Sequence, residues 1–333
     1  MGAECRIYLL AYQPIYSHGG NNMASIQMNL LILYMKLQHF ISPPIREVNL
    51  EKERSGFEAF AKLFKPLAEL KNTAVDVNGV PGEWVTPLLV TNGRVILYLH
   101  GGYYMIGSIQ SHRNLAGNIA NAAQARALII DYRLAPEHPF PAALDDALIA
   151  YLWLLAQGIR PDQIFLVGDS AGGGLVLSTL LALRERGKPL PAAAICLSPA
   201  TDLTLSGESW KFNAKKELIV TRYIGEQVQT MYLGGINPRD PLASPLFGDL
   251  HGLPPLLVQV GSDEVLLSDS TSFAERARSA GVDVTLEVWP RMQHVWQFTA
   301  SFVPEARKAI DRIGEFIKNA SQKIEVGTYR QPV

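Results

Sequence analysis

Cysteine is scarce in this 333-residue chain, which contains only Cys5 and Cys196. Two cysteines are too few for a disulfide framework or for a metal site built from thiolates. Cys196 lies in an apolar run, where a free thiol behaves as a small buried hydrophobe. A chain without a disulfide framework suits a reducing compartment, so we expect a cytoplasmic location.

An excess of charge of one sign is also absent. Lys and Arg together number 30 and Asp and Glu number 31, which leaves a formal net charge of -1. A protein that holds a polyanion needs a basic excess. The charge balance therefore argues against nucleic acid as a partner.

Long hydrophobic runs are missing too. Residues 7–12 and 30–35 are apolar, but both runs fall far short of the ~20 residues that span a bilayer, so we expect no integral membrane segment. The first run also lacks the small-residue cleavage site of a secretion signal. We interpret residues 1–22 as a disordered leader or tag, with Met23 available as a natural start, and residues 323–333 as a C-terminal tail.

Short apolar runs separated by helix-length segments are abundant. Such runs are typical of parallel strands that are buried on both faces of a sheet. The predicted strands are residues 73–77, 83–86, 95–99, 127–131, 164–167, 193–197, 256–260 and 284–289, and the predicted helices are 112–125, 141–157, 171–186 and 270–280. This alternation predicts an α/β fold with a mostly parallel central sheet flanked by helices.

Two stretches do not follow the alternation of strands and helices. Residues 23–70 and 204–240 are helix-like and rich in large apolar side chains. We expect them to form a helical cap over a catalytic domain made of residues 71–203 and 241–322. For each of these side chains the alternative is ordinary core packing.

A serine stands between two glycines where a predicted strand gives way to a predicted helix, in Gly168-Asp169-Ser170-Ala171-Gly172. This pattern is typical of a nucleophile elbow, in which a strained turn lifts the serine hydroxyl above the edge of the sheet. The five residues alone are a weak signal, because such matches also arise by chance. The elbow interpretation requires a histidine and a carboxylate elsewhere in the chain.

Only two of the seven histidines lie just past the end of a predicted strand, where open α/β sheets place their sites. His294 follows the strand 284–289 and comes after Ser170 in the expected chain order, so we predict that it is the general base. His100 follows the strand 95–99 and is expected to be structural. The alternatives are a merely local hydrogen bond for His294 and a catalytic role for His100.

Three acidic residues follow the strand 256–260 and are candidates for the acid that orients the histidine. We favour Asp263, which comes first after the strand. Glu264 is interpreted as a solvated neighbour, and Asp269 as the N-cap of the helix that follows. Asp169, beside the nucleophile, is expected to support the elbow, because adjacent side chains on a sharp turn diverge.

An acyl-transfer site also needs backbone N–H groups directed at the developing negative charge. The loop His100-Gly101-Gly102-Tyr103 offers them, since glycine lets the backbone approach a reacting carbonyl closely. The N–H of Ala171, at the start of a helix, completes the group. We therefore predict an oxyanion hole formed by Gly101, Gly102, Tyr103 and Ala171.

Together these motifs resemble the hormone-sensitive-lipase-like family of α/β-hydrolases, in its bacterial carboxylesterase branch. The matching residues are His100-Gly101-Gly102, residues 131–141, the elbow at 168–172, Asp263-Glu264-Val265-Leu266 and His294-Val295-Trp296, and the likeness runs from about residue 72 to 320. The resemblance implies an α/β-hydrolase fold and cleavage of short- to medium-chain carboxylic esters under a helical cap, without metal or cofactor. It implies a Ser-His-Asp triad of Ser170, His294 and Asp263, and it leaves a homodimer open.

Tyr103 departs from the family pattern, which usually has a third glycine at this position. Its side chain adds bulk beside the carbonyl site, so we hypothesise a narrower site that disfavours esters of tertiary alcohols. The residues expected to line the substrate pocket are Tyr34, Tyr104, Phe212, Val265, Leu266 and Val295. Residues 132–141, with three prolines, are expected to be a rigid supporting loop.

Two other functions are compatible with this sequence. The same triad can act on lactones or amides, and only a panel of substrates separates these reactions from ester cleavage. The fold can also serve as a non-catalytic ligand-binding receptor when a triad member is lost. The presence of Ser170, Asp263 and His294 argues against that second possibility.

Overall fold

The structure is a computed structural model and describes residues 24–41, 49–91 and 93–328. Its centre is an eight-stranded sheet with the order β1-β2-β4-β3-β5-β6-β7-β8. The strands are β1 Leu70–Val77, β2 Val80–Pro87, β3 Val95–Leu99, β4 Arg126–Ile130, β5 Ile164–Asp169, β6 Ala193–Leu197, β7 Leu256–Gly261 and β8 Val284–Trp289. All pairs from β4 to β8 are parallel, whereas β1–β2 and β2–β4 are antiparallel. The predicted α/β fold is confirmed.

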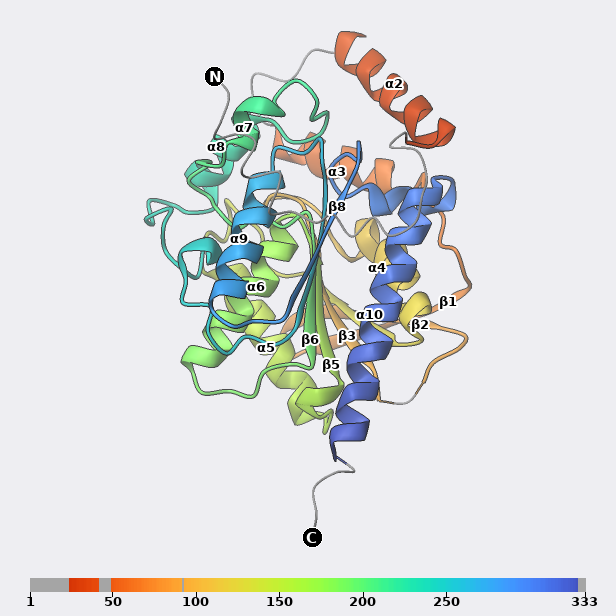
Figure 1. Ribbon diagram of the computed structural model, residues 1–333, viewed down its shortest axis with the longest axis vertical. Coiled ribbons are helices and arrows are strands. Elements are labelled where there is room, and N and C mark those ends of the chain that lie inside the picture. Colours follow the sequence, from red (N-terminus) through yellow and green to blue (C-terminus); the bar gives the residue numbers. More distant parts are fainter. Residues whose placement is uncertain (1–23, 42–48, 92, 329–333) are drawn as a thin grey trace.

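Helices cover both faces of the sheet (Figure 1). The helices α5 Ala142–Ala156, α6 Ala171–Glu185 and α9 Leu267–Ser279 lie on one face, and α4 Ile109–Ala123 and α10 Pro304–Thr328 lie on the other. Each predicted helix matches one of these within a few residues. The long helix α10 was not predicted, and it continues into the segment that we interpreted as a tail from residue 323.

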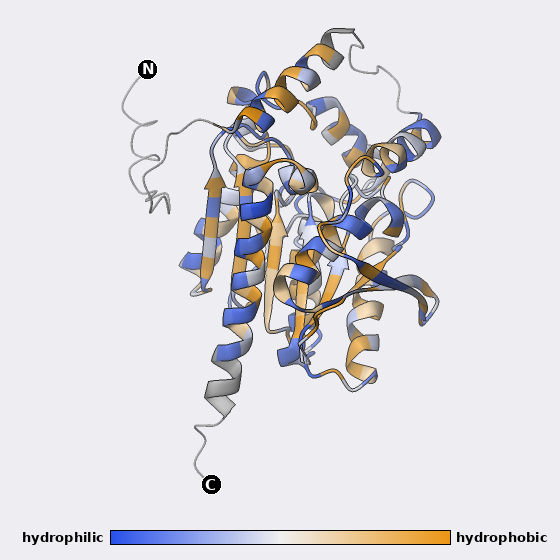
Figure 2. Ribbon diagram, turned by 90° about the vertical axis from the view of Figure 1, so that its right-hand side faces the viewer, coloured by the Kyte–Doolittle hydropathy of each residue, from blue (hydrophilic) through white to orange (hydrophobic). Residues whose placement is uncertain are grey.

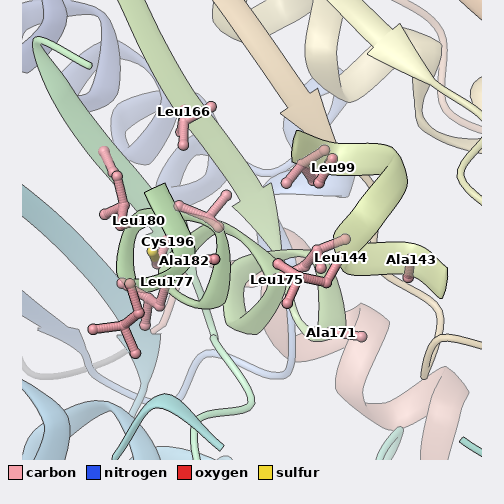
Figure 3. Close-up of a cluster of buried hydrophobic side chains, with 14 of the residues drawn as sticks. Leu99, Ala143, Leu144, Leu166, Ala171, Leu175, Leu177, Leu180, Ala182 and Cys196 are labelled. Carbon is pink, nitrogen blue, oxygen red and sulfur yellow. The ribbon is translucent and has the colours of Figure 1, made fainter. Parts of the chain in front are cut away.

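Successive side chains of the central strands enter two different cores. Leu97 and Leu99 pack with α5 and α6, whereas Ile96 and Tyr98 pack with α4 and α10. Figure 2 shows the strands mostly in the colour of hydrophobic residues, between helices that alternate in polarity. Figure 3 shows the first core, where Leu99 and Leu166 of the sheet face Leu144 and Leu175 of the helices. Burial on both faces explains why these strands are almost purely apolar.

The segments outside the alternation are helical. Residues 24–61 contain α2 Ile26–Ile41 and α3 Leu50–Ala61, and residues 204–240 contain α7 Ser209–Phe212 and α8 Arg222–Met231. These four helices lie together at one end of the molecule (Figure 1). The predicted leader, residues 1–22, lies outside the described residues.

Candidate active site

Ser170 lies at the junction between β5 and α6. Its backbone has φ 53° and ψ -120°, a strained conformation for a residue with a side chain, of the kind that costs about 1–3 kcal/mol and gathers at functional sites. The turn is tight, because a Cβ atom on Gly172 would lie 2.0 Å from the carbonyl oxygen of Leu99. Only glycine fits there. The glycine at position 172 therefore allows the close approach that the predicted elbow requires.

His294 lies in the loop that follows β8, and its ring reaches the elbow. Its Nε2 atom is 2.8 Å from Ser170 Oγ. Both residues are buried, with relative exposures of 7% and 6%. Because an imidazole nitrogen at this distance can accept the hydroxyl proton, the pair has the geometry of a nucleophile and its general base.

The carboxylate that meets His294 belongs to Glu264, so the expected contact with Asp263 is wrong. His294 Nδ1 lies 3.0 Å from Glu264 Oε2, and the side chain of Glu264 is fully buried. Asp263 is half-buried, and its recorded hydrogen bond is with the hydroxyl of the adjacent Ser262, at 3.2 Å. The turn after β7 directs these two neighbouring side chains apart. The interpretation of Glu264 as a solvated neighbour is therefore also wrong.

Two further donors hold the Glu264 carboxylate from its other side. Its Oε1 atom accepts hydrogen bonds from the Gly261 N–H, at 2.6 Å, and from the Ser198 hydroxyl, at 2.8 Å. Ser198 is buried directly after β6 and was not predicted as a site residue. The available signal was a polar residue immediately after an apolar strand, at the edge where the other site residues lie.

The carboxylates around His294 raise its pKa. Burial alone would lower the pKa of His294, but the hydrogen bond and the negative charge of Glu264, with Glu217 and Asp169 farther off, hold this pKa above its ordinary value. A base with a raised pKa binds a proton more strongly. His294 is thereby suited to take the proton of Ser170.

The backbone N–H groups of Gly102, Tyr103 and Ala171 have no hydrogen-bond acceptor within the part of the chain that the structure describes. Gly102 has φ 117°, and a Cβ atom there would lie 2.2 Å from the carbonyl oxygen of Ile106, so this position requires glycine. Tyr103 has φ 59°, in the left-handed region that penalises side chains. Gly101 was wrongly included, because its N–H donates to Asp169 Oδ1 at 3.0 Å.

Known proteins are similar to this chain over most of its length. A family model for the alpha/beta hydrolase fold matches residues 96–298. An acetyl-hydrolase of Streptomyces hygroscopicus is 45% identical over 276 residues, which are 83% of this chain and 92% of that protein. A crystal structure of an esterase from the bacterial hormone-sensitive lipase family is 45% identical, with a TM-score of 0.85, and covers 90% of this chain and 99% of that one.

The chain belongs to the hormone-sensitive-lipase-like family of α/β-hydrolases. An esterase of Acinetobacter venetianus is also similar, at 37% identity over 264 residues, or 79% of this chain and 87% of that protein. No helix among the described residues combines the length and apolar composition needed to cross a membrane.

Asp169 and His100 support this family member's elbow and oxyanion loop, as predicted from the sequence. Asp169 accepts hydrogen bonds from Tyr98, at 2.7 Å, and from Gly101. His100 stacks on Tyr132 with 4.1 Å between the ring centroids, and its Nδ1 lies 2.7 Å from the Gly101 carbonyl oxygen. Burial, followed by the nearby His112, lowers the pKa of His100 to about 3, so the ring is neutral at physiological pH.

A cavity that is partly open to solvent lies beside Ser170, and the empty space of about 430 Å³ around it includes open solvent. Five of its lining residues come from the inserted segment 204–240: Leu205, Trp210, Val220, Gly225 and Val228. Tyr104 and Leu266 line it as predicted, and Tyr103 lines it too. The other four predicted pocket residues do not: Tyr34 and Phe212 are exposed, and Val265 and Val295 are buried outside the lining. Hydrophobicity alone does not tell in which direction such side chains point.

Asp269 is not the N-cap of α9, which is preceded by Leu266. It lies inside the first turn of the helix, fully buried, and its Oδ2 accepts hydrogen bonds from the backbone N–H groups of Thr201 and Asp202, both at 2.9 Å. Burial and then the charge of Asp202 raise the pKa of Asp269 to about 8. Asp269 therefore anchors the start of the segment that carries the pocket lining.

Proposed function

We propose that this protein is a serine esterase that hydrolyses short- to medium-chain carboxylic esters through Ser170, His294 and Glu264. The observation that carries the proposal is the continuous hydrogen-bonded chain from Ser170 Oγ through His294 to Glu264, at 2.8 and 3.0 Å. The family supports the same reaction class, since its similar members include an acetyl-hydrolase and an esterase.

In the first half of the reaction, Ser170 Oγ attacks the ester carbonyl carbon while its proton moves to His294 Nε2. Glu264 keeps the Nδ1 proton in place and stabilises the imidazolium that forms. Collapse of the tetrahedral intermediate breaks the bond to the alcohol oxygen, which takes the proton from His294 and leaves. The acyl group remains on Ser170.

In the second half, water takes the place of the alcohol. It gives a proton to His294 Nε2 and attacks the acyl carbonyl, and collapse of this second intermediate returns the proton to Ser170 and releases the carboxylic acid. In both halves the negative oxygen is held by the N–H groups of Gly102, Tyr103 and Ala171. Loss of one such donor costs about 3–4 kcal/mol in comparable sites.

The cavity beside Ser170 is the proposed acyl-chain pocket. Its lining is apolar apart from Tyr103, Tyr104, Ser170 and Asp202. Asp202 is engaged with Thr204 and Ser206 of its own loop, so its carboxylate is committed to local hydrogen bonds. A lining of this character favours an apolar acyl group over a charged one.

Replacement of the nucleophile tests the proposal. Ser170→Ala is expected to abolish hydrolysis of p-nitrophenyl butyrate and to prevent covalent labelling by an organophosphate, which the parent protein should show. Undiminished hydrolysis by Ser170→Ala would refute the assignment. Lactones and amides tested beside esters of equal acyl length then define the reaction class.

Three further predictions concern the whole molecule. We propose that residues 23–70 and 204–240 act together as a cap over the catalytic domain, which the position of their helices at one end supports (Figure 1). A cytoplasmic location rests on the scarcity of cysteine. A homodimer stays a prediction that size measurement in solution can test.

A further inference from the structure

The inserted segment presents three buried polar side chains at intervals of four residues. Ser209, Asn213 and Glu217 have relative exposures of 0%, 0% and 8%, although Lys211, Lys215 and Lys216 between them are exposed. Buried polar groups are normally hydrogen-bonded, so these three must have partners inside the protein. All three contact the loop that carries Glu264, residues 261–268, which we call the acid loop.

Asn213 bridges two carbonyl groups of the acid loop. Its Nδ2 donates to the backbone oxygen of Ser262, at 2.9 Å, and to that of Glu264 itself, at 2.8 Å. Its Oδ1 atom is buried without a partner among the described residues. Burial of an unpaired oxygen costs free energy. The favourable polar interactions of the Asn213 side chain are therefore the two hydrogen bonds that its Nδ2 donates.

The other two residues extend the same attachment. Ser209 and Ser268 exchange hydrogen bonds, each accepting from the other's backbone N–H at 2.9 Å. Glu217 Oε2 accepts from the N–H of Val265, at 3.3 Å, and its Oε1 accepts from two N–H groups of its own segment.

The histidine loop is attached as well. The N–H of Leu218, next to Glu217, donates to Gln293 Oε1 at 3.1 Å, and Gln293 precedes His294. The inserted segment therefore contacts the loops on both sides of the Glu264–His294 hydrogen bond, the acid loop through its backbone and the histidine loop through the Gln293 side chain.

We propose that Asn213 and Glu217 are positioning residues that hold Glu264 against His294, so that the inserted segment belongs to the catalytic apparatus as well as to the pocket wall. This inference rests on the proposed esterase function. Without Asn213 the backbone carbonyl groups of Ser262 and Glu264 lose the two hydrogen bonds that its amide donates. A displacement of Glu264 by 1 Å is enough to cost about 10²-fold in rate.

Glu217 also acts through its charge. The charged groups that face His294 are Glu264 on the acid loop, Glu217 on the inserted segment and Asp169 at the end of β5, and each raises the pKa of His294. Glu217→Gln keeps the shape and removes one of these charges. If the amide oxygen keeps the two N–H groups at the Oε1 position, the amide NH₂ takes the Oε2 position, where the Val265 N–H then loses its acceptor. The acidic limb of the activity profile, where His294 must lose its proton to act as a base, is then expected at lower pH.

The test compares Asn213→Ala and Glu217→Gln with a matched control, Gln229→Ala. Gln229 lies in α8 of the same segment and also donates from its amide to a backbone oxygen, that of Leu203, at 2.6 Å, but not to the acid loop. We expect kcat for p-nitrophenyl butyrate to fall about 10- to 100-fold in Asn213→Ala with KM within about 3-fold. Gln229→Ala should keep the parent kcat.

The pH profile separates positioning from a merely structural role. In Glu217→Gln the midpoint of the acidic limb should move to lower pH, which loss of packing alone does not cause. This near-isosteric variant also keeps the test decisive if Asn213→Ala fails to fold. A parent-like midpoint in Glu217→Gln, a parent-like kcat in folded Asn213→Ala, or an equal loss in Gln229→Ala would overturn the inference.

Failure of this inference differs from failure of the proposed function. If Ser170→Ala retains activity, the esterase mechanism itself is wrong. If Ser170→Ala is inactive while the Asn213 and Glu217 variants match the parent in kcat and pH profile, the mechanism holds and only the positioning role is lost.

Discussion

Replacement of Glu264 by glutamine should disable the enzyme, because it moves the proton of the neutral His294 ring from Nδ1 to Nε2. Glu264 Oε1 accepts a hydrogen bond from the N–H of Gly261, a group that can only donate. In Glu264→Gln the amide oxygen must therefore occupy the Oε1 position, and the amide NH₂ must face His294 Nδ1. That nitrogen then has to accept, so the ring carries its proton on Nε2, directed at Ser170.

The size of the effect follows from this tautomer. An imidazole with its proton on Nε2 cannot take the proton of Ser170 without first rearranging. The corresponding acid-to-amide change in serine proteases lowers kcat by about 10⁴-fold. We expect a similar loss here, equivalent to about 5 kcal/mol of transition-state stabilisation.

Asp263→Asn is the matched control, since it makes the same chemical change one residue away. Asp263 is half-buried and bonds to the adjacent Ser262, not to His294, so kcat should stay close to that of the parent and stability should change by no more than about 0.5 kcal/mol. The assay is hydrolysis of p-nitrophenyl butyrate by both variants, with a thermal melt to show that each is folded. A loss near 10³-fold or more in Asp263→Asn, beside a nearly active Glu264→Gln, would refute this reasoning.

Three other predictions concern specificity and pH. Tyr103→Gly relieves a left-handed backbone at φ 59° and removes bulk beside the carbonyl site, so hydrolysis of a tert-butyl ester should improve relative to an n-butyl ester; an unchanged ratio contradicts this. A Cβ atom on Gly225 would lie 2.9 Å from both Cδ atoms of Leu205, so Gly225→Ala should push Leu205 into the pocket and lower the ratio of hexanoate to acetate hydrolysis by about 10-fold; parent-like chain-length preference sinks the pocket assignment. The pKa of Asp269 is raised from 3.8 to about 8, so the folded protein binds a proton here that the unfolded chain does not hold above about pH 4. The resulting contribution to the free energy of unfolding is lost as pH rises toward 8. Because Asn does not titrate, the Tm of Asp269→Asn relative to the parent should increase from pH 5 to pH 8, and a constant difference argues against that account.

The sheet was predictable because its strands are buried on both faces. Leu97 and Ile96 enter opposite cores, so the strand that contains them has no polar side and stands out as an apolar run. The elbow and His294 were predictable from their places after such runs, since parallel strands bring their carboxyl ends to one edge. Their order in the chain and their positions after strand ends were sufficient to predict Ser170 and His294.

The acid was not predictable by the same rule. Asp263 and Glu264 both follow β7, and the choice between them depends on the direction of each side chain in the turn. That direction is set by contacts from distant segments, such as the Asn213 amide and the Ser198 hydroxyl. In the sequence, Asn213 and Ser198 resemble ordinary polar loop residues.

The identity of the acid is thus a property of the donors around it. A carboxylate can orient His294 only if its second oxygen is satisfied, because a buried unpaired charge is costly. The Gly261 N–H and the Ser198 hydroxyl supply that satisfaction at the position that Glu264 reaches. Asp263, which points elsewhere, lacks both donors. The glycine-flanked Ser170 can act as a nucleophile only where neighbouring elements hold the Glu264 carboxylate against His294. In this chain those elements include the inserted segment.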